Sequence, residues 1–217
     1  MNLLQAARAD RVPVVYASSA VVYGDNADQP LTERAQVRPP SAYASDKLGC
    51  EQHARVASLV HGVPTLGLRI FHVYGPRQPS HSAYSQSITR YLQQILVGGP
   101  VVIVGDGEQL IDLIYVTDVA RFFYAAMTHL GRLPGIFNVC SGQALTHNQL
   151  VSQLMRSTGI EVPVKYQVSA EVMIRVSVGD PRRAIQLLGV RSKQCLDRGF
   201  RLLVNSVRES DVNEIIA

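Results

Sequence analysis

The chain has 217 residues, a formal net charge of +4, 47% hydrophobic residues and 18% charged residues. This balance is typical of a globular protein that is long enough to bury a sizeable core. The positive charges are spread along the chain, no basic block is longer than Arg182-Arg183, and no aromatic residues alternate with them. We therefore expect no nucleic-acid partner, although the spread charge can attract an anionic substrate.

The cysteine and hydropathy patterns limit the compartment and the metal chemistry. Cys50, Cys140 and Cys195 form no Cys-x-x-Cys pair, and the six histidines show no metal-ligand spacing. We expect no metal site and a reducing, cytoplasmic location. No apolar run approaches the roughly 20 residues that cross a membrane, and no signal-peptide pattern follows Met1, so we expect no membrane partner.

The first half of the chain predicts helices that alternate with strands. Gly62 and the pair Gly98-Gly99 are helix stop signals. In chain order, the expected elements are a helix from Asn2 to Ala9, a strand from Val12 to Ala17, a helix from Ala42 to His61, a strand from Thr65 to Phe71 and a helix from Ser85 to Val97.

The second half continues this alternation, which predicts a parallel sheet with crossover helices. Thr117 or Asp118 would cap one helix and Thr146 another. The expected elements are strands Val101 to Val104 and Ile111 to Val116, a helix to about Leu130, a strand Ile136 to Val139, and helices Asn148 to Ser157, Arg182 to Leu188 and Cys195 to Val204.

Tyr43 and Lys47 are the first candidate site residues. They lie four residues apart in the predicted helix, so both side chains leave the same helix face. The chain has only three lysines, so a lysine at this position by chance is improbable. An ammonium group favours the phenolate form of a nearby phenol, and the pair is therefore a candidate proton-transfer group.

Ser18 and Ser19 are the second pair of candidates. They follow the apolar run Val12 to Tyr16, which reads as a buried parallel strand. Open α/β sheets bind ligands beyond the carboxyl ends of their strands, so either hydroxyl would stand at the mouth of a site. The serines could also simply end the strand or cap the next turn.

Four sequence blocks together resemble the extended short-chain dehydrogenase/reductases, and in particular their NAD-dependent nucleotide-sugar epimerases and dehydratases, such as UDP-glucose 4-epimerase. The resemblance covers nearly the whole chain. The blocks run from Ala17 to Asp25, from Ser41 to Lys47, from Arg69 to Gln78 and from Gly105 to Asp118.

The resemblance implies an α/β fold with a partial Rossmann-like parallel sheet and a smaller C-terminal α/β substrate-binding region. Residues 1–75 would be the C-terminal part of a truncated NAD-binding domain. Residues 76–217 would mostly bind substrate, with segments at about 101–140 returning to the sheet. The chain lacks the Gly-x-x-Gly-x-x-Gly turn with which family members hold the dinucleotide pyrophosphate.

The resemblance also implies roles for individual residues in a 4-epimerisation that passes through a 4-keto sugar, with NAD as cofactor. Tyr43 would exchange a proton with the sugar, Lys47 would favour its phenolate form, and Ser19 would hydrogen-bond the reacting oxygen. The implied cofactor contacts are Tyr43, Lys47, Phe71 and Ser18, and the implied substrate contacts are Ser19, Tyr43, His72, Arg77 and Tyr84.

Some positions depart from the family pattern and leave alternatives open. His72 stands where an asparagine is usual, and Ile111 stands where an arginine grips phosphate; Arg175 could replace a second arginine. The expected partner is a nucleotide sugar, most simply a UDP-sugar, and the resemblance implies a homodimer. The alternatives are an inactive paralogue or fragment with a binding role, or a related dehydratase, decarboxylase or reductase.

Overall fold

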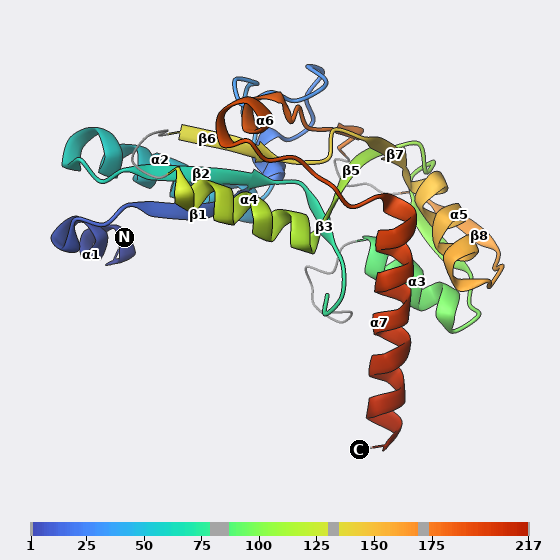
Figure 1. Cartoon of the computed structure of the whole chain (residues 1–217). Helices are drawn as coiled ribbons and strands as arrows, with labels where there is room; N and C mark the ends of the chain where they lie inside the picture. The colour runs from blue at the N-terminus through green and yellow to red at the C-terminus, as the bar shows by residue number, and fades with distance from the viewer. Residues whose placement is uncertain (1, 79–86, 130–134, 169–173, 217) are drawn as a thin grey trace.

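The structure is a computed structural model of the chain. It describes residues 2–78, 87–129, 135–168 and 174–216, with side chains described as far as residue 209. Figure 1 shows an elongated body with the N-terminus at one end and the helix α7 projecting from the other.

The main sheet holds three parallel strands in the order β1-β2-β6, namely β1 (Val14–Ser19), β2 (Thr65–Ile70) and β6 (Gly135–Val139). Val14 lies beside Thr65, and Leu66 lies beside Gly135. Because the strands are parallel, their carboxyl ends meet at one end of the sheet, where the serines lie.

Helices cover both faces of this sheet (Figure 1). On one face, Leu66 and Leu68 pack in a core with Phe122 of α4 (Val116–Thr128), and α6 (Arg182–Leu188) packs beside it. On the other face, Thr65 and Arg69 bond to α2 (Ala42–His61), to which α1 (Asn2–Asp10) is attached. The alternation of strand side chains explains why β2 is apolar toward α4 and polar toward α2.

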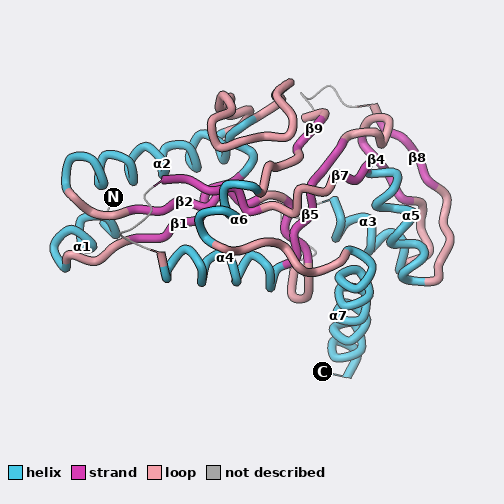
Figure 2. Tube along the Cα trace, turned by 45° about the horizontal axis from the view of Figure 1, so that its top comes forward, coloured by secondary structure: helices cyan, strands magenta, loops and turns pink. Residues whose placement is uncertain are grey.

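The C-terminal region has small sheets and a core of its own (Figure 2). The strand β5 pairs in parallel with β3 and β9 and antiparallel with β7, whereas β4 pairs in parallel with β8. Three helices pack into this core through residues such as Leu92, Leu154 and Phe200. The elements are β3 (His72–Tyr74), α3 (Ser87–Leu96), β4 (Val101–Val104), β5 (Leu110–Tyr115), β7 (Ala144–Thr146), α5 (His147–Thr158), β8 (Val164–Gln167), β9 (Val176–Ser177) and α7 (Leu196–Ile216).

Several helix limits follow the sequence signals, but α7 continues to Ile216, twelve residues beyond the expected end at Val204. The Ser41 hydroxyl caps α2, and Gly62 ends it in a left-handed conformation. Thr146 caps α5 with a complete capping box. The first strand runs to Ser19 rather than ending at Ala17, and a short 3-10 turn (Ala20–Tyr23) follows it.

The structure adds detail to one expectation and corrects another. Of the described residues between about 101 and 140, α4 and β6 lie on the main sheet, whereas β4 and β5 pair within the C-terminal region. Tyr115, not Thr117 or Asp118, precedes α4, and its side chain makes no capping bond. Asp118 instead accepts hydrogen bonds from Ser192, Lys193 and Gln194, and so fixes a distant loop.

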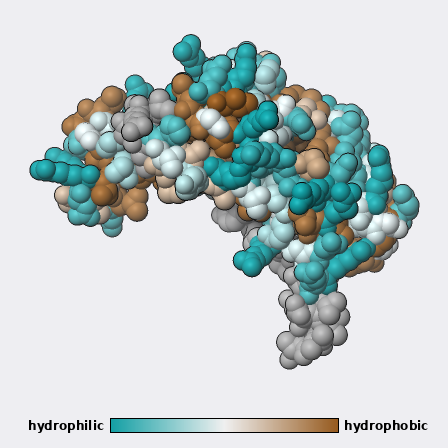
Figure 3. Space-filling model, viewed as in Figure 1, coloured by the Kyte–Doolittle hydropathy of each residue, from teal (hydrophilic) through white to brown (hydrophobic). Residues whose placement is uncertain are grey.

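Apolar side chains reach the surface at the end of the molecule formed by α1 and the last turns of α2. Hydrophobic groups gather there in Figure 3, and Leu3, Val56, Leu59 and Val60 are exposed. None of the described helices combines the length and apolar character that crossing a bilayer requires.

Candidate active site

Tyr43 and Lys47 lie on one face of α2, as their spacing predicts. The Lys47 Nζ atom lies 5.6 Å from the centre of the Tyr43 ring and 3.4 Å from the Ala17 carbonyl oxygen, to which it donates. This bond ties the helix to β1 just before the two serines. Tyr43 is 45% exposed.

The two serines that end β1 have different surroundings. Ser19 is half-buried, and its hydroxyl oxygen accepts the Val21 N–H at 3.3 Å as the cap of the following turn. Ser18 is buried and donates to Glu51 Oε1 at 2.5 Å. Because neighbouring strand residues face opposite sides, only one serine can belong to an open site.

The side chains of Phe71 and Ser18, two of the predicted cofactor contacts, are both buried, and their cofactor role stays a prediction. The Phe71 ring packs with Tyr23 at a centroid distance of 6.4 Å, in a cluster that also contains Leu31 and Cys140.

His72 is half-buried on β3. Its Nδ1 atom is buried and has no partner among the described residues. Burial, followed by the nearby His147, lowers the pKa of His72 from 6.5 to about 4. The ring is therefore neutral near pH 7, and Nδ1 can accept a hydrogen bond but carries no charge for a phosphate.

The remaining positions singled out in the sequence lie in different surroundings. Arg77 is exposed in the loop after β3 and has a positive φ of 66°, which is uncommon for a residue with a side chain. Tyr84 lies outside the described residues. Ile111 is buried in the C-terminal core, and Arg175 forms an exposed ion pair with Asp106 at 3.0 Å.

A buried ionic network behind the serines is absent from the sequence predictions. Glu51 of α2 accepts Arg69 Nε at 2.9 Å and Arg69 Nη2 at 2.7 Å, in addition to the Ser18 hydroxyl. The Arg69 guanidinium also lies 4.7 Å from the centre of the Tyr23 ring. A charged residue inside the apolar run Thr65 to Ile70 was the signal that could have revealed this network.

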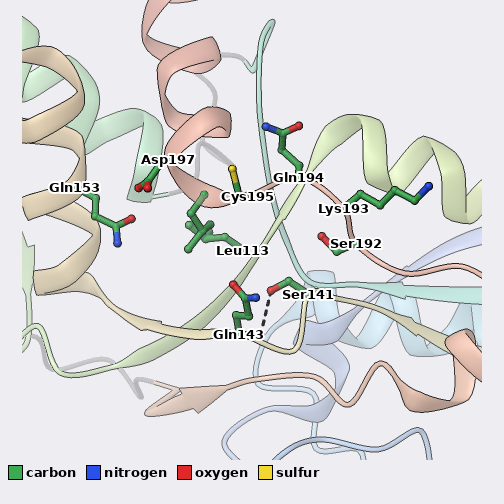
Figure 4. Close-up of a pocket in the computed structure, with 10 residues that line it drawn as sticks. Leu113, Ser141, Gln143, Gln153, Ser192, Lys193, Gln194, Cys195 and Asp197 are labelled. Atoms are coloured by element: carbon green, nitrogen blue, oxygen red, sulfur yellow. Dashed lines mark hydrogen bonds between the residues drawn. The ribbon is translucent and has the colours of Figure 1, made fainter.

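The cavity in Figure 4 is separate from Tyr43, Lys47 and Ser19. Its volume is about 390 Å³, and it lies beneath the loop that leads into α7, with Leu113, Ser141, Gln153 and Asp197 in its walls. None of the candidate catalytic residues lines it. In the part of the chain that the structure describes, no group of three or more acidic, histidine or cysteine side chains could hold a metal ion.

The two edges of the main sheet differ in whether side chains hydrogen-bond to their backbone groups. At the β6 edge, Glu33 accepts the Asn138 N–H at 2.8 Å, and Arg183 donates to the Ile136 carbonyl at 3.2 Å. Among the described residues, β1 pairs only with β2. Side chains thus cap one edge, while the other keeps backbone groups that a further strand could bond.

Comparisons with known proteins show which family the chain resembles. Residues 1–140 match the model of the NAD dependent epimerase/dehydratase family. The chain is 34% identical over 180 residues to ADP-L-glycero-D-manno-heptose-6-epimerase of Pseudomonas aeruginosa (strain UCBPP-PA14), covering 78% of this chain and 54% of that protein. The chain thus spans about half the length of this curated relative.

Two solved structures share the fold. UDP-N-acetylglucosamine 4-epimerase from Methanobrevibacter ruminantium M1, in complex with UDP-N-acetylmuramic acid, superposes with a TM-score of 0.91 at 29% identity, covering 96% of this chain and 67% of that chain. Thermus thermophilus UDP-glucose 4-epimerase, in complex with NAD, superposes with a TM-score of 0.84 at 28% identity, covering 95% and 68%. The chain belongs to the NAD dependent epimerase/dehydratase family.

Proposed function

We propose that this chain carries the catalytic and sugar-binding part of an NAD-dependent nucleotide-sugar epimerase. The observation that carries the proposal is the contact between Tyr43 and Lys47, held against the carboxyl end of β1 by the Ala17 carbonyl. Family membership and the likeness to UDP-sugar 4-epimerases support the same reaction class.

In this proposal Tyr43 exchanges a proton with a sugar hydroxyl, and Ser19 hydrogen-bonds the reacting oxygen. The Lys47 ammonium lies 5.6 Å from the centre of the Tyr43 ring, on the same face of α2. A positioned acid–base group of this kind contributes about 10²- to 10⁴-fold to a rate. His72 and Arg77 are the proposed substrate contacts on the β3 side, with Tyr84 as a third candidate.

The residues fit one end of NAD and not the other. Tyr43 and Lys47 would contact the nicotinamide ribose, and bound NAD would accept a hydride from the sugar and return it. The sequence contains no Gly-x-x-Gly-x-x-Gly turn to hold the pyrophosphate. The open edge of β1 is where a glycine-rich strand, turn and helix would extend the sheet.

The proposed substrate is a nucleotide sugar, with a UDP-sugar first. The solved relatives support UDP, because both are named as epimerases of UDP-sugars. Because one relative is named as an ADP-heptose 6-epimerase, the test also includes an ADP-sugar and epimerisation at a carbon other than C4.

A chimera tests the proposal by joining a family member's glycine-rich strand, turn and helix ahead of residue 1. Chromatography would follow the interconversion of UDP-glucose and UDP-galactose, with ADP-heptose in parallel. We expect Tyr43→Phe to lower turnover at least about 100-fold while NAD stays bound. Tyr124→Phe, at an exposed tyrosine of α4, is the matched control and should leave turnover unchanged.

Retained turnover in Tyr43→Phe would refute the role of the phenol. For the 217-residue chain alone, we expect no measurable NAD binding by calorimetry, because nothing in it cradles the pyrophosphate. Tight binding there would refute our view of the cofactor site. A binding role without turnover is the second candidate function, and Ile111, which stands where the family pattern has an arginine and is buried, favours it.

We also propose a homodimer that forms through the outer face of α1 and α2. Leu3, Val56 and Val60 are exposed there, at 68%, 50% and 69%. Val60→Asp should shift the sedimentation coefficient to that of a monomer, whereas Val97→Asp, at an equally exposed valine beyond α3, should not. The three free cysteines suit the cytoplasm as the proposed location.

A further inference from the structure

A second cavity, of about 440 Å³, lies between α2 and the main sheet. Thr65 and Gly135, the first residues of β2 and β6, line it. Ser19 ends β1 at the opposite end of the parallel sheet. The cavity therefore opens at the other end of the sheet from Ser19, although Glu51 and Arg69 of the network behind the serines form part of its wall. Its volume falls in the range of small-molecule sites.

A glycine in the middle strand lets the Tyr16 ring lie flat at the edge of this cavity. Tyr16, Gly67 and Ile136 lie in one row across β1, β2 and β6. A Cβ atom on Gly67 would meet Tyr16 Oη at 2.5 Å, so the phenol of Tyr16 lies across the glycine. Close-packed α/β layers normally cover such a row with side chains, whereas here Tyr16 and Ile136 line a cavity.

The walls of the cavity are apolar on two sides. Leu48 and Leu59 contribute from α2, Val37 from the loop before that helix, and Ile136 from β6. Leu59 is 74% exposed, although it stands directly over this opening. An apolar body of about ten non-hydrogen atoms would cover these side chains, and the gain would come from apolar burial.

Of the charged side chains that line the cavity, one cation has no counter-ion among the described residues. Glu51 and Arg69 form an ion pair with both side chains buried, so they cancel each other. Arg55 lies one helical turn beyond Glu51, is exposed, and has no hydrogen bond or ion pair among the described residues. Burial, followed by Glu51, raises the pKa of Tyr16, so its hydroxyl group remains a donor.

We propose that this cavity binds a small amphipathic monocarboxylate, with its carboxylate on Arg55 and its apolar body over Tyr16, Leu59 and Ile136. Arginine suits a carboxylate because its planar fork donates two parallel hydrogen bonds. Gln52 and Ser58 supply further polar groups at the rim.

The test uses 3-phenylpropanoate as the probe, titrated into the ¹⁵N-labelled 217-residue chain and followed by NMR. We expect saturable shifts at α2, β2 and β6. The uncharged 3-phenylpropanamide should bind at least about fivefold more weakly, and Arg55→Gln should weaken the carboxylate by about five- to tenfold. Arg201→Gln, at an exposed arginine of α7, removes the same charge elsewhere and should leave binding unchanged.

Ser58→Phe fills the cavity and should abolish the shifts while the chain stays folded by circular dichroism. Equal affinity for the amide, an equal effect of Arg55→Gln and Arg201→Gln, or shifts confined to other elements would each overturn the proposal. NAD and UDP-glucose should not compete with the probe. Because none of these measurements needs turnover, the site can stand if the proposed epimerase activity fails.

Discussion

Replacing Glu51 by Gln is the sharpest test of how this fold is held together. Glu51 and Arg69 are 4% and 5% exposed, and two hydrogen bonds of 2.7 and 2.9 Å join them. The substitution keeps the size of the side chain but removes its charge. The Arg69 guanidinium then remains buried without a counter-ion, and the Ser18 hydroxyl loses a charged acceptor.

The cost follows from these contacts. Removing one partner of a buried ion pair typically costs about 3–5 kcal/mol, and an ordinary domain has only about 5–15 kcal/mol of stability. We therefore expect Glu51→Gln to lower the free energy of unfolding by about 3–5 kcal/mol. Ser18→Ala should cost less, about 1–2 kcal/mol, because it removes one hydrogen bond.

Urea unfolding followed by circular dichroism measures both effects. The matched control is Arg175→Gln, because Arg175 and Asp106 form a similar two-oxygen contact with 53% and 56% of their side chains exposed. Exposed pairs contribute about 0–1 kcal/mol. A loss below about 1 kcal/mol in Glu51→Gln would refute the reasoning, since the network would then behave like a surface pair.

Three further perturbations test other parts of the structure. Burial and then His147 lower the folded-state pKa of His72 to about 4, so protonation of this ring favours the unfolded chain. The stability that depends on neutral His72 is complete above pH 6.5 and falls toward pH 4. In urea titrations at several pH values, His72→Asn should reduce this acid loss by up to about 3 kcal/mol. Gly67→Ala should destabilise the chain because its Cβ meets Tyr16, and a second change, Tyr16→Leu, should restore much of the loss in thermal melts; no rescue would contradict the contact. Thr146→Ala removes a helix cap and should cost about 1 kcal/mol, whereas Thr146→Ser should keep most of the stability.

The amino-acid sequence by itself determined the helices and the face that carries the candidate chemistry. Ser41 and Gly62 mark the ends of α2, and the four-residue spacing places Tyr43 and Lys47 together, as the 5.6 Å contact confirms. These features depend on local backbone geometry, which short stretches of sequence encode. The family resemblance, which rests on whole motifs, is confirmed by the match over residues 1–140.

Tertiary structure alone decided which serine is enclosed, which strands pair, and where charge is buried. Ser18 and Ser19 look alike in sequence, but the register of β1 turns Ser18 toward Glu51 and leaves Ser19 at the strand end. The pairing of β4 with β8 joins segments about 60 residues apart, which no local pattern encodes. Contacts of this kind depend on how distant segments pack, so they emerge only when the whole chain has folded.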